Sequence, residues 1–265
     1  MTTRRTPLFI LSHMRSYSSV LSHVLGSHPE IDGYCETHLR YRVSLDFMRL
    51  KWRVRRLTGE PLRGHMVLDK ILHNYALTRS LLDSPDTQAV FLLRQPVEAL
   101  QSIIHMGRQL DANERNADAA SATAYYVDRV RRLAKLAPLL GARAAFVESE
   151  QLLTHTEQTL NFLTHFLGLD APLDRRYRRF PRTGRPGSGD PSPAISTGEL
   201  ATGELATGEL GARREKKPRY SIPSALIANA VEAHAECLAA CNYHCVPVSA
   251  EPRRVASREQ MSLAG

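Results

Sequence analysis

Two short apolar runs in this chain each lead into a polar turn and then into a helix-like pattern. The run Ala89–Leu93 is followed by Arg94 and Pro96, and the run Pro7–Leu11 is followed by the polar segment Ser12–Ser19. Short apolar runs bounded by turn residues are typical of buried strands. Proline is favoured at the first position of a helix, because its missing N–H costs nothing there. These strand-turn-helix units favour an α/β fold.

The rest of the chain continues this alternation. Helices are predicted over residues 17–27, 39–57, 75–83, 96–108, 119–140, 152–167 and 223–242, and strands near 7–12, 65–70, 89–93 and 143–147. Strands that alternate with helices indicate a parallel sheet with crossover helices. At 265 residues, the chain is long enough for one domain with a sizeable core. The predicted fold class is therefore α/β, with a parallel β-sheet flanked by helices.

Both units carry groups that suit an anionic ligand. Open α/β sheets bind ligands outside the carboxyl ends of their strands, and Arg94 stands at such an end while Ser102 faces it from the next helix. An arginine and a hydroxyl together bind phosphate well. The first unit places Arg15 and several serines where a helix N-terminus favours an anion. A surface arginine beside an ordinary serine cap is the simpler reading of either unit alone.

Together the two units resemble the sulfotransferase family that uses 3′-phosphoadenosine 5′-phosphosulfate (PAPS). In that family the first strand-turn-helix binds the 5′-phosphosulfate with a Lys or Arg followed by small and hydroxyl residues. The matching residues here are Arg15, Ser16, Tyr17, Ser18 and Ser19. A later Arg with a Ser eight residues on binds the 3′-phosphate, and Arg94 and Ser102 have that spacing. The departure is Tyr17, which stands where the family usually has a small residue, often Gly.

The resemblance covers about residues 7–245 and includes the segments 25–36 and 189–199. It implies a P-loop NTPase-like three-layer architecture and a single sulfotransferase domain over 1–265. This domain would carry a flexible Gly/Pro-rich insertion at about 181–221 and a C-terminal helix at about 223–242. It also implies PAPS as donor substrate, 3′-phosphoadenosine 5′-phosphate as by-product, and no metal. The acceptor would be a hydroxyl of a small molecule, carbohydrate or lipid.

Relatives fold a C-terminal basic segment over the nucleotide, and Lys216 and Arg219 could take that part here. A plain basic linker is the other reading. Just before them, Thr-Gly-Glu-Leu recurs at 197–200, 202–205 and 207–210. That period is too short for a solenoid unit, so we expect a duplicated loop segment.

Sulfuryl transfer needs a donor held in line, neutralised charge on the oxygens, and a base for the acceptor hydroxyl. Glu36 ranks first as the base, because bacterial and carbohydrate-acting relatives often place a base after the first helix. His73 ranks second, since the cytosolic branch places a lysine and a catalytic histidine in a setting like that of Lys70 and His73. His38 ranks third. A satisfied structural histidine is the simpler reading of His73 and of His38.

Two other functions stay open. A P-loop kinase or NTPase shares the strand-loop-helix logic, but the chain has no Gly-Lys pair, so the phosphate-binding signature of that class is absent. Asp69 is the one candidate for its magnesium ligand at a strand end. The second alternative is a non-catalytic domain that binds polyanions through the same basic pocket.

Charge and composition indicate which classes of partner this chain could bind. Lysines and arginines number 35 against 27 acidic residues, a formal net charge of +8, which suits anionic ligands, nucleic acid or membrane surfaces. The chain lacks the interleaved basic and aromatic residues that are typical of proteins that bind single-stranded nucleic acid, so nucleic acid is not an expected partner. The densest basic run, Lys51–Arg56, reads as a solvated helix face that could steer an acidic acceptor.

No apolar run approaches the roughly 20 residues of a membrane span, so no integral membrane segment is expected. Oligomeric state stays open.

The four cysteines do not form a disulfide framework, which fits a reducing, cytoplasmic setting. Cys237, Cys241 and Cys245, with His234 and His244, could suggest a metal site. Their spacing of four instead stacks the thiols along one helix face. Core packing of small apolar thiols is therefore preferred over zinc, which usually takes paired ligands from two separate elements.

Overall fold

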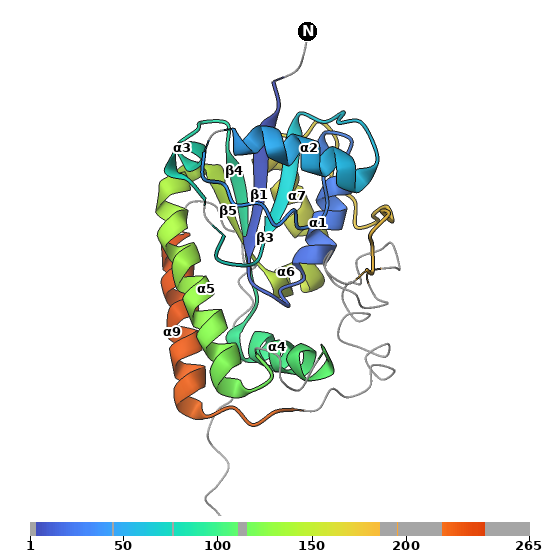
Figure 1. Cartoon of the computed structure of the whole chain (residues 1–265). Helices are drawn as coiled ribbons and strands as arrows, with labels where there is room; N and C mark the ends of the chain where they lie inside the picture. The colour runs from blue at the N-terminus through green and yellow to red at the C-terminus, as the bar shows by residue number, and fades with distance from the viewer. Residues whose placement is uncertain are drawn as a thin grey trace, which may run out of the picture.

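A five-stranded parallel sheet forms the centre of the molecule (Figure 1). The computed structural model describes residues 4–43, 45–75, 77–110, 116–185, 195 and 219–241. Its strands are β1 (Thr6–Ser12), β2 (Ile31–Asp32), β3 (Met66–Ile71), β4 (Gln88–Leu93) and β5 (Ala144–Glu148). They lie in the order β2-β3-β1-β4-β5, and every neighbouring pair is parallel. The predicted α/β class is confirmed.

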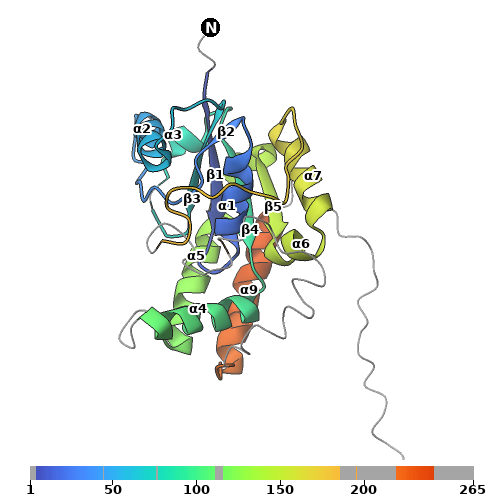
Figure 2. The ribbon, with the colours of Figure 1, turned by 90° about the vertical axis from the view of Figure 1, so that its right-hand side faces the viewer.

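Helices cover both faces of the sheet (Figure 2). They are α1 (Ser18–Ser27), α2 (Asp46–Thr58), α3 (Arg79–Leu82), α4 (Pro96–Leu110), α5 (Ala119–Leu140), α6 (Ser149–Thr154), α7 (Thr156–Leu167) and α9 (Ser224–Ala240), with a 3₁₀ turn at Gly141–Arg143. One buried cluster joins α1, α6 and α7 to the sheet, and another joins α2, α4, α5 and α9 to its opposite face. Three layers result, as expected.

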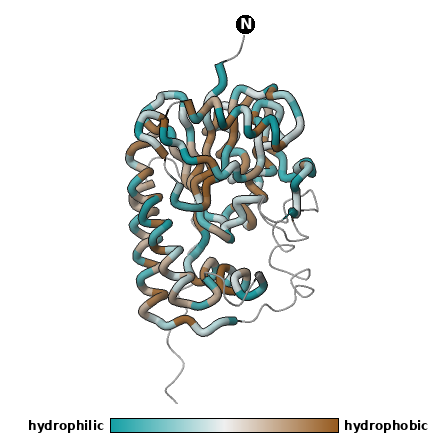
Figure 3. The backbone as a smooth tube through the Cα atoms, viewed as in Figure 1, coloured by the Kyte–Doolittle hydropathy of each residue, from teal (hydrophilic) through white to brown (hydrophobic). Residues whose placement is uncertain are grey.

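Alternation along β1 explains why both faces need a cover. Phe9 and Leu11 belong to the cluster that includes α5 and α9, while Leu8 and Ile10 belong to the cluster that includes α1 and α7. Successive strand residues point to opposite faces, so a strand buried on both sides reads as a continuous apolar run. Figure 3 shows the hydrophobic stretches gathered in the sheet region.

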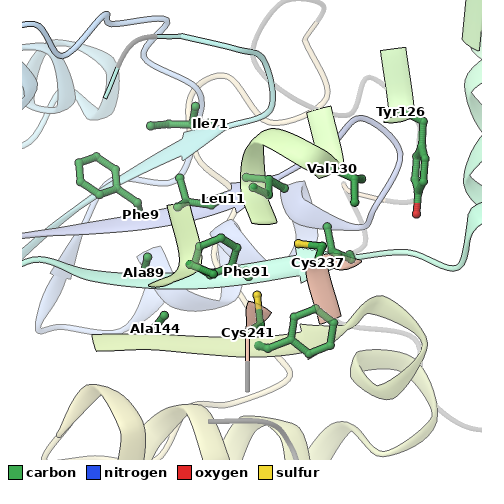
Figure 4. Close-up of a cluster of buried hydrophobic side chains, with 14 of the residues drawn as sticks. Phe9, Leu11, Ile71, Ala89, Phe91, Tyr126, Val130, Ala144, Cys237 and Cys241 are labelled. Carbon is green, nitrogen blue, oxygen red and sulfur yellow. The ribbon is translucent and has the colours of Figure 1, made fainter. Parts of the chain in front are cut away.

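Two of the cysteines pack in the core. Cys237 and Cys241 are almost fully buried and point into the cluster that contains Phe91 and Val130 (Figure 4). Their thiols therefore act as small apolar groups under α5, as the spacing indicated. Cys245 and His244 lie outside the described residues. Within the described part of the chain, no helix is both long enough and apolar enough to cross a bilayer.

Several predicted boundaries are wrong, and each has a local cause. The helix expected over 39–57 begins at Asp46, because Tyr41 instead forms a parallel bridge with Leu77. The helix expected over 75–83 begins only at Arg79, after Thr78 caps it. The helix expected over 152–167 is two helices that meet at His155. Strand β2 was missed because it has only two residues, too few for a periodic pattern.

Gly26→Ala should destabilise the protein, although alanine in a helix interior usually gains about 1 kcal/mol over glycine. An added Cβ at Gly26 would overlap the carbonyl oxygen of Gly33, and overpacking of this kind costs about 1–3 kcal/mol. Denaturant unfolding measures the change. Gly59→Ala is the comparison: its φ of +72° adds backbone strain, but no described atom lies within 4 Å of the added Cβ, so it measures strain without overlap. A Gly26→Ala protein as stable as its parent would contradict this packing.

Candidate functional site

The turn between β1 and α1 is fixed by buried hydroxyls at the carboxyl end of the sheet. The hydroxyl oxygens of Ser12 and Ser16 lie 2.6 Å apart, and Ser16 donates to the carbonyl of His13 at 2.8 Å. Ser149, the first residue of α6 after β5, donates to the carbonyl of Ser16 at 2.6 Å. Helix α1 then begins at Ser18 without a side-chain cap. Its first-turn N–H groups and dipole thus favour an anion.

Two residues of this turn adopt left-handed backbone conformations. Arg15 has φ 64° and Tyr17 has φ 61°. This region is sterically costly for side chains other than glycine, which explains why a small residue would be expected at position 17. The structure accommodates the tyrosine by placing its ring under a guanidinium group: the Arg94 guanidinium carbon lies 4.9 Å from the ring centre. A cation–π contact of this kind stabilises the pair.

The two sequence units meet directly. Arg15 donates from Nε to the Ser102 hydroxyl at 3.1 Å, and Arg94 donates from Nη1 to the carbonyl of Arg15 at 3.2 Å. These contacts join the β1–α1 turn to the β4–α4 unit. The predicted anion-binding residues of both units therefore lie in one place, next to the carboxyl ends of the central strands β1 and β4.

The Arg94 guanidinium group has an N–H donor that no described residue accepts. Its Nε atom is buried and has no hydrogen bond among the described residues. The nearest carboxylates are Glu150, 3.8 Å from Nε, and Glu98, 3.8 Å from Nη2, too far for hydrogen bonds. Burial raises the pKa of Glu150. A buried N–H without a partner is costly, and a phosphate oxygen would supply the missing acceptor. The residues present therefore fit a phosphate group.

Buried groups that sequence reasoning missed hold Arg94 in place. Its backbone N–H donates to Nε2 of His13 at 3.0 Å, and the Tyr126 hydroxyl donates to its carbonyl at 3.0 Å. Burial lowers the pKa of His13 to about 3, so this ring is neutral and can accept. Arg129 donates to the carbonyls of Ser12 at 2.8 Å and Ile71 at 2.7 Å, tying the ends of β1 and β3 together. No motif marks these residues.

The candidate bases gather beside Lys70. The Lys70 ammonium donates to the Ser19 hydroxyl at 2.9 Å and lies 3.5 Å from a carboxylate oxygen of Glu36. His38 Nδ1 lies 3.9 Å from the other oxygen of Glu36. Burial lowers the pKa of His73, and the Glu36 charge opposes that shift. Lys70 thus links the start of α1 to the Glu36 carboxylate, and an ammonium group beside a carboxylate can neutralise charge and accept a proton.

Asp69 anchors the segment that carries Glu36. Its carboxylate accepts from the backbone N–H of Thr37 at 2.9 Å, from the Thr37 hydroxyl at 2.6 Å and from the Tyr41 hydroxyl at 2.5 Å. Burial raises the pKa of Asp69 to about 6. Asp69 is 1% exposed and both of its oxygens accept hydrogen bonds from the protein, an environment unlike that of Mg²⁺, which usually keeps several water ligands.

The basic segment after the Thr-Gly-Glu-Leu repeat is only partly described. Lys216 and the repeat lie outside the described residues, and Arg219 is exposed. The next residue, Tyr220, exchanges two hydrogen bonds with the Gln101 side chain, at 2.7 and 2.8 Å. Gln101 precedes Ser102 in α4, so Arg219 is tied to the helix that carries Ser102.

Comparisons with known proteins leave the family open. No family model matches the chain, and no match is found among curated proteins. Among solved structures, the chain is similar to the sulfotransferase domain from the curacin biosynthetic pathway, with 13% identity and a TM-score of 0.45. The similarity covers 86% of this chain and 97% of that domain. At this level it says nothing about donor or acceptor.

Stability should fall as the pH drops below about 6.5, because two histidines are buried in neutral form. Burial lowers the pKa of His13 to about 3 and that of His23 to about 4. Between the unfolded value of about 6.5 and these values, the unfolded chain binds protons that the folded chain cannot. Each histidine should then lower the free energy of unfolding at pH 5 by about 2 kcal/mol relative to pH 7.5.

The pH dependence is measured as the difference between variant and parent, which removes the opposing contribution of Asp69. His23→Asn keeps a donor for the carbonyl of Ser19, which Nδ1 of His23 contacts at 2.7 Å. This variant should lose less stability between pH 7.5 and pH 5 than the parent. His165→Asn is the control, because His165 is exposed. Equal slopes for His23→Asn and the parent would show that His23 protonates in the folded state.

Proposed function

We propose that this protein is a PAPS-dependent sulfotransferase that transfers a sulfuryl group to an acceptor hydroxyl. The observation that carries the proposal is the contact between the two sequence units, through Arg15 with Ser102 and Arg94 with Tyr17. These contacts assemble one cationic site at the strand ends where open α/β sheets bind ligands. The motif resemblance supports the donor, since the same residues correspond to both phosphate subsites of that family.

The residues divide between the two ends of the donor. The uncapped start of α1, with Ser18 and Ser19, would hold the 5′-phosphosulfate together with Arg15. The Ser16 hydroxyl donates to the His13 carbonyl within the turn, so Ser16 would contribute through its backbone N–H. Arg94 and Ser102 would hold the 3′-phosphate, with the unsatisfied Arg94 Nε as a donor. PAPS, when bound, supplies the sulfuryl group. Arg219 and Lys216 would approach the nucleotide from the segment that Tyr220 fastens to α4.

On the acceptor side, Glu36 is the proposed base. Its carboxylate lies beside Lys70, which also reaches the start of α1 through Ser19. The lysine therefore lies between the anion-binding turn and the base, where an ammonium group can neutralise charge on the transferred group. The Asp69 network fixes the neighbouring Thr37 and so limits the freedom of Glu36. His73 is the alternative base. Burial lowers the pKa of His73, so its imidazole stays neutral, and able to accept a proton, at a lower pH.

Kinase or NTPase activity is the competing assignment. The chain lacks a Gly-Lys pair, and the oxygens of Asp69 are engaged by Thr37 and Tyr41. Both observations favour sulfuryl over metal-assisted phosphoryl transfer. The direct test is incubation with labelled PAPS and a panel of hydroxylated acceptors, read by label transfer and mass shift. A protein that binds the nucleotide but transfers no sulfuryl group to any of them would support a non-catalytic polyanion-binding domain instead.

Glu36→Gln should retain nucleotide binding and lose about 10²–10⁴-fold in kcat, because a positioned base contributes that much. The glutamine keeps the volume of the side chain but cannot accept the proton. Turnover and nucleotide-induced thermal shift are measured on the same sample. His73→Gln is the matched variant, and it should retain far more activity. Near-normal turnover by Glu36→Gln with an inactive His73→Gln would move the role to His73.

The pocket should distinguish nucleotides by their 3′-phosphate. Hydrogen bonds to a charged group contribute roughly 1.5–3 kcal/mol each, at least about tenfold in affinity. 3′-Phosphoadenosine 5′-phosphate should therefore raise the Tm much more than 5′-AMP or ATP with magnesium. Arg94→Ala should abolish the difference, whereas Arg79→Ala, at an exposed position of α3, should preserve it. Equal stabilisation by ATP with magnesium would contradict the donor assignment and favour a kinase.

A further inference from the structure

Helix α2 exposes apolar side chains that the fold does not use. Of the seven large hydrophobic residues that are exposed in the described part of the chain, four lie between positions 43 and 52. Three of them belong to the α2 region: Leu45 is 64% exposed, Met48 61% and Trp52 59%. Scattered single apolar residues on a surface are ordinary, but a cluster of them marks an interaction site.

These three residues form one stripe. With 3.6 residues per turn, positions i, i+3 and i+7 lie on the same side of a helix, and Leu45, Met48 and Trp52 have that spacing. The opposite side of α2 packs against the sheet through Leu50 and Val54. The stripe therefore points outward, and Figures 1 and 2 both place α2 at the periphery of the molecule.

Cations border the stripe on both sides. Arg49 and Arg53 lie along one side, and Lys51 and Arg55 lie along the other, each pair one helical turn apart. Arg56 stacks on the Trp52 ring, with 5.3 Å between the guanidinium carbon and the ring centre. Long basic side chains with apolar stems suit a boundary between apolar and polar surroundings.

Among the residues that the structure describes, Arg49 is the one flanking cation with a carboxylate partner, Asp46 at 2.8 Å, and Lys51, Arg53, Arg55 and Arg56 form no salt bridge. Positions 40–56 contain seven lysines and arginines and a single acidic residue, Asp46. The Asp46 side chain is 2% exposed and accepts hydrogen bonds from the backbone N–H groups of Arg42 and Val43 and from Arg49. The Asp46 carboxylate is thus buried, and the side chains that α2 exposes around the stripe are basic and apolar.

We propose that α2 docks this protein on an anionic lipid bilayer, with Leu45, Met48 and Trp52 in the headgroup region and the flanking cations on lipid phosphates. A basic amphipathic surface with an aromatic and aliphatic stripe is the chemistry that binds such membranes. A nucleic acid would match the arginines but not the protruding Leu45 and Met48. The proposal concerns a surface outside the anion-binding site and does not depend on the donor or the acceptor.

Trp52 is the one tryptophan in the sequence, so its fluorescence reports on this surface directly. The full chain is titrated with vesicles of phosphatidylcholine alone and of phosphatidylcholine with phosphatidylglycerol at low salt. Emission should shift to shorter wavelength only with the anionic vesicles, and lipids brominated on their chains should quench it. Raising the salt should reverse binding, because exposed charges are screened. Absence of quenching, or equal binding to both vesicles, would overturn the proposal.

Two variants separate charge from apolar contact. Arg55→Gln/Arg56→Gln should weaken vesicle binding about 25-fold, because each basic residue near an anionic surface contributes about fivefold. Leu45→Ser/Met48→Ser should weaken it without changing the salt dependence. The control is Arg132→Gln/Lys135→Gln, which removes two exposed charges from α5. An equal loss of vesicle affinity in the control would show that binding depends on net charge alone and would contradict a specific role for α2. A blue shift that grows with protein concentration without vesicles would assign the surface to a second copy of the chain.

Discussion

The contact between Arg94 and the β1–α1 turn is the interaction on which the candidate site depends. It joins two segments that are far apart in the sequence, through the Tyr17 ring and the carbonyl of Arg15. Parallel strands bring both segments to the same edge of the sheet, but adjacency alone does not orient a guanidinium group. The orientation comes from His13 and Tyr126, which fix the backbone of Arg94 from both sides.

The same edge of the sheet contains three buried side chains that can carry a charge. Lys70, Asp69 and Arg129 are each no more than 2% exposed. Burying a charge is costly unless partners compensate it. Lys70 lies 3.5 Å from the Glu36 carboxylate, whereas Asp69 and Arg129 are compensated by hydrogen bonds to neutral groups. Asp69 has Thr37 and Tyr41, and Arg129 has the strand-end carbonyls. A rigid polar frame of this kind suits a site that must hold charged groups without rearrangement.

Sequence reasoning recovered the strands because their signal is local. A parallel strand buried on both faces must be apolar throughout, so Leu8–Leu11 and Ala89–Leu93 were visible as runs. The two-residue β2 and the extended start of the segment before α2 have no such periodicity. Their conformation depends on distant partners, such as the Asp69 carboxylate for Thr37 and Tyr41.

The residues of the candidate site likewise fall into those that the sequence predicted and those that it did not. Arg94, Ser102 and the serine-rich turn could be predicted because hydroxyls and an arginine at strand ends have a local meaning. His13, Tyr126 and Arg129 could not, because they act through backbone groups that only the folded chain brings near them. The role of Tyr17 also needed the structure. The sequence marks it as a departure from a small residue, while the fold uses its ring to support Arg94.

The Glu36 segment connects the candidate site to the exposed surface of α2. Leu45 lies nine positions after Glu36, and Thr37 and Tyr41 between them are hydrogen-bonded to Asp69 of β3. The inner side of α2 packs on the sheet through Leu50 and Val54, and the stripe of Leu45, Met48 and Trp52 faces away from it. The anion-binding turn belongs to a different connection, between β1 and α1. Nucleotide recognition and surface docking are therefore physically separable, and each can fail without the other.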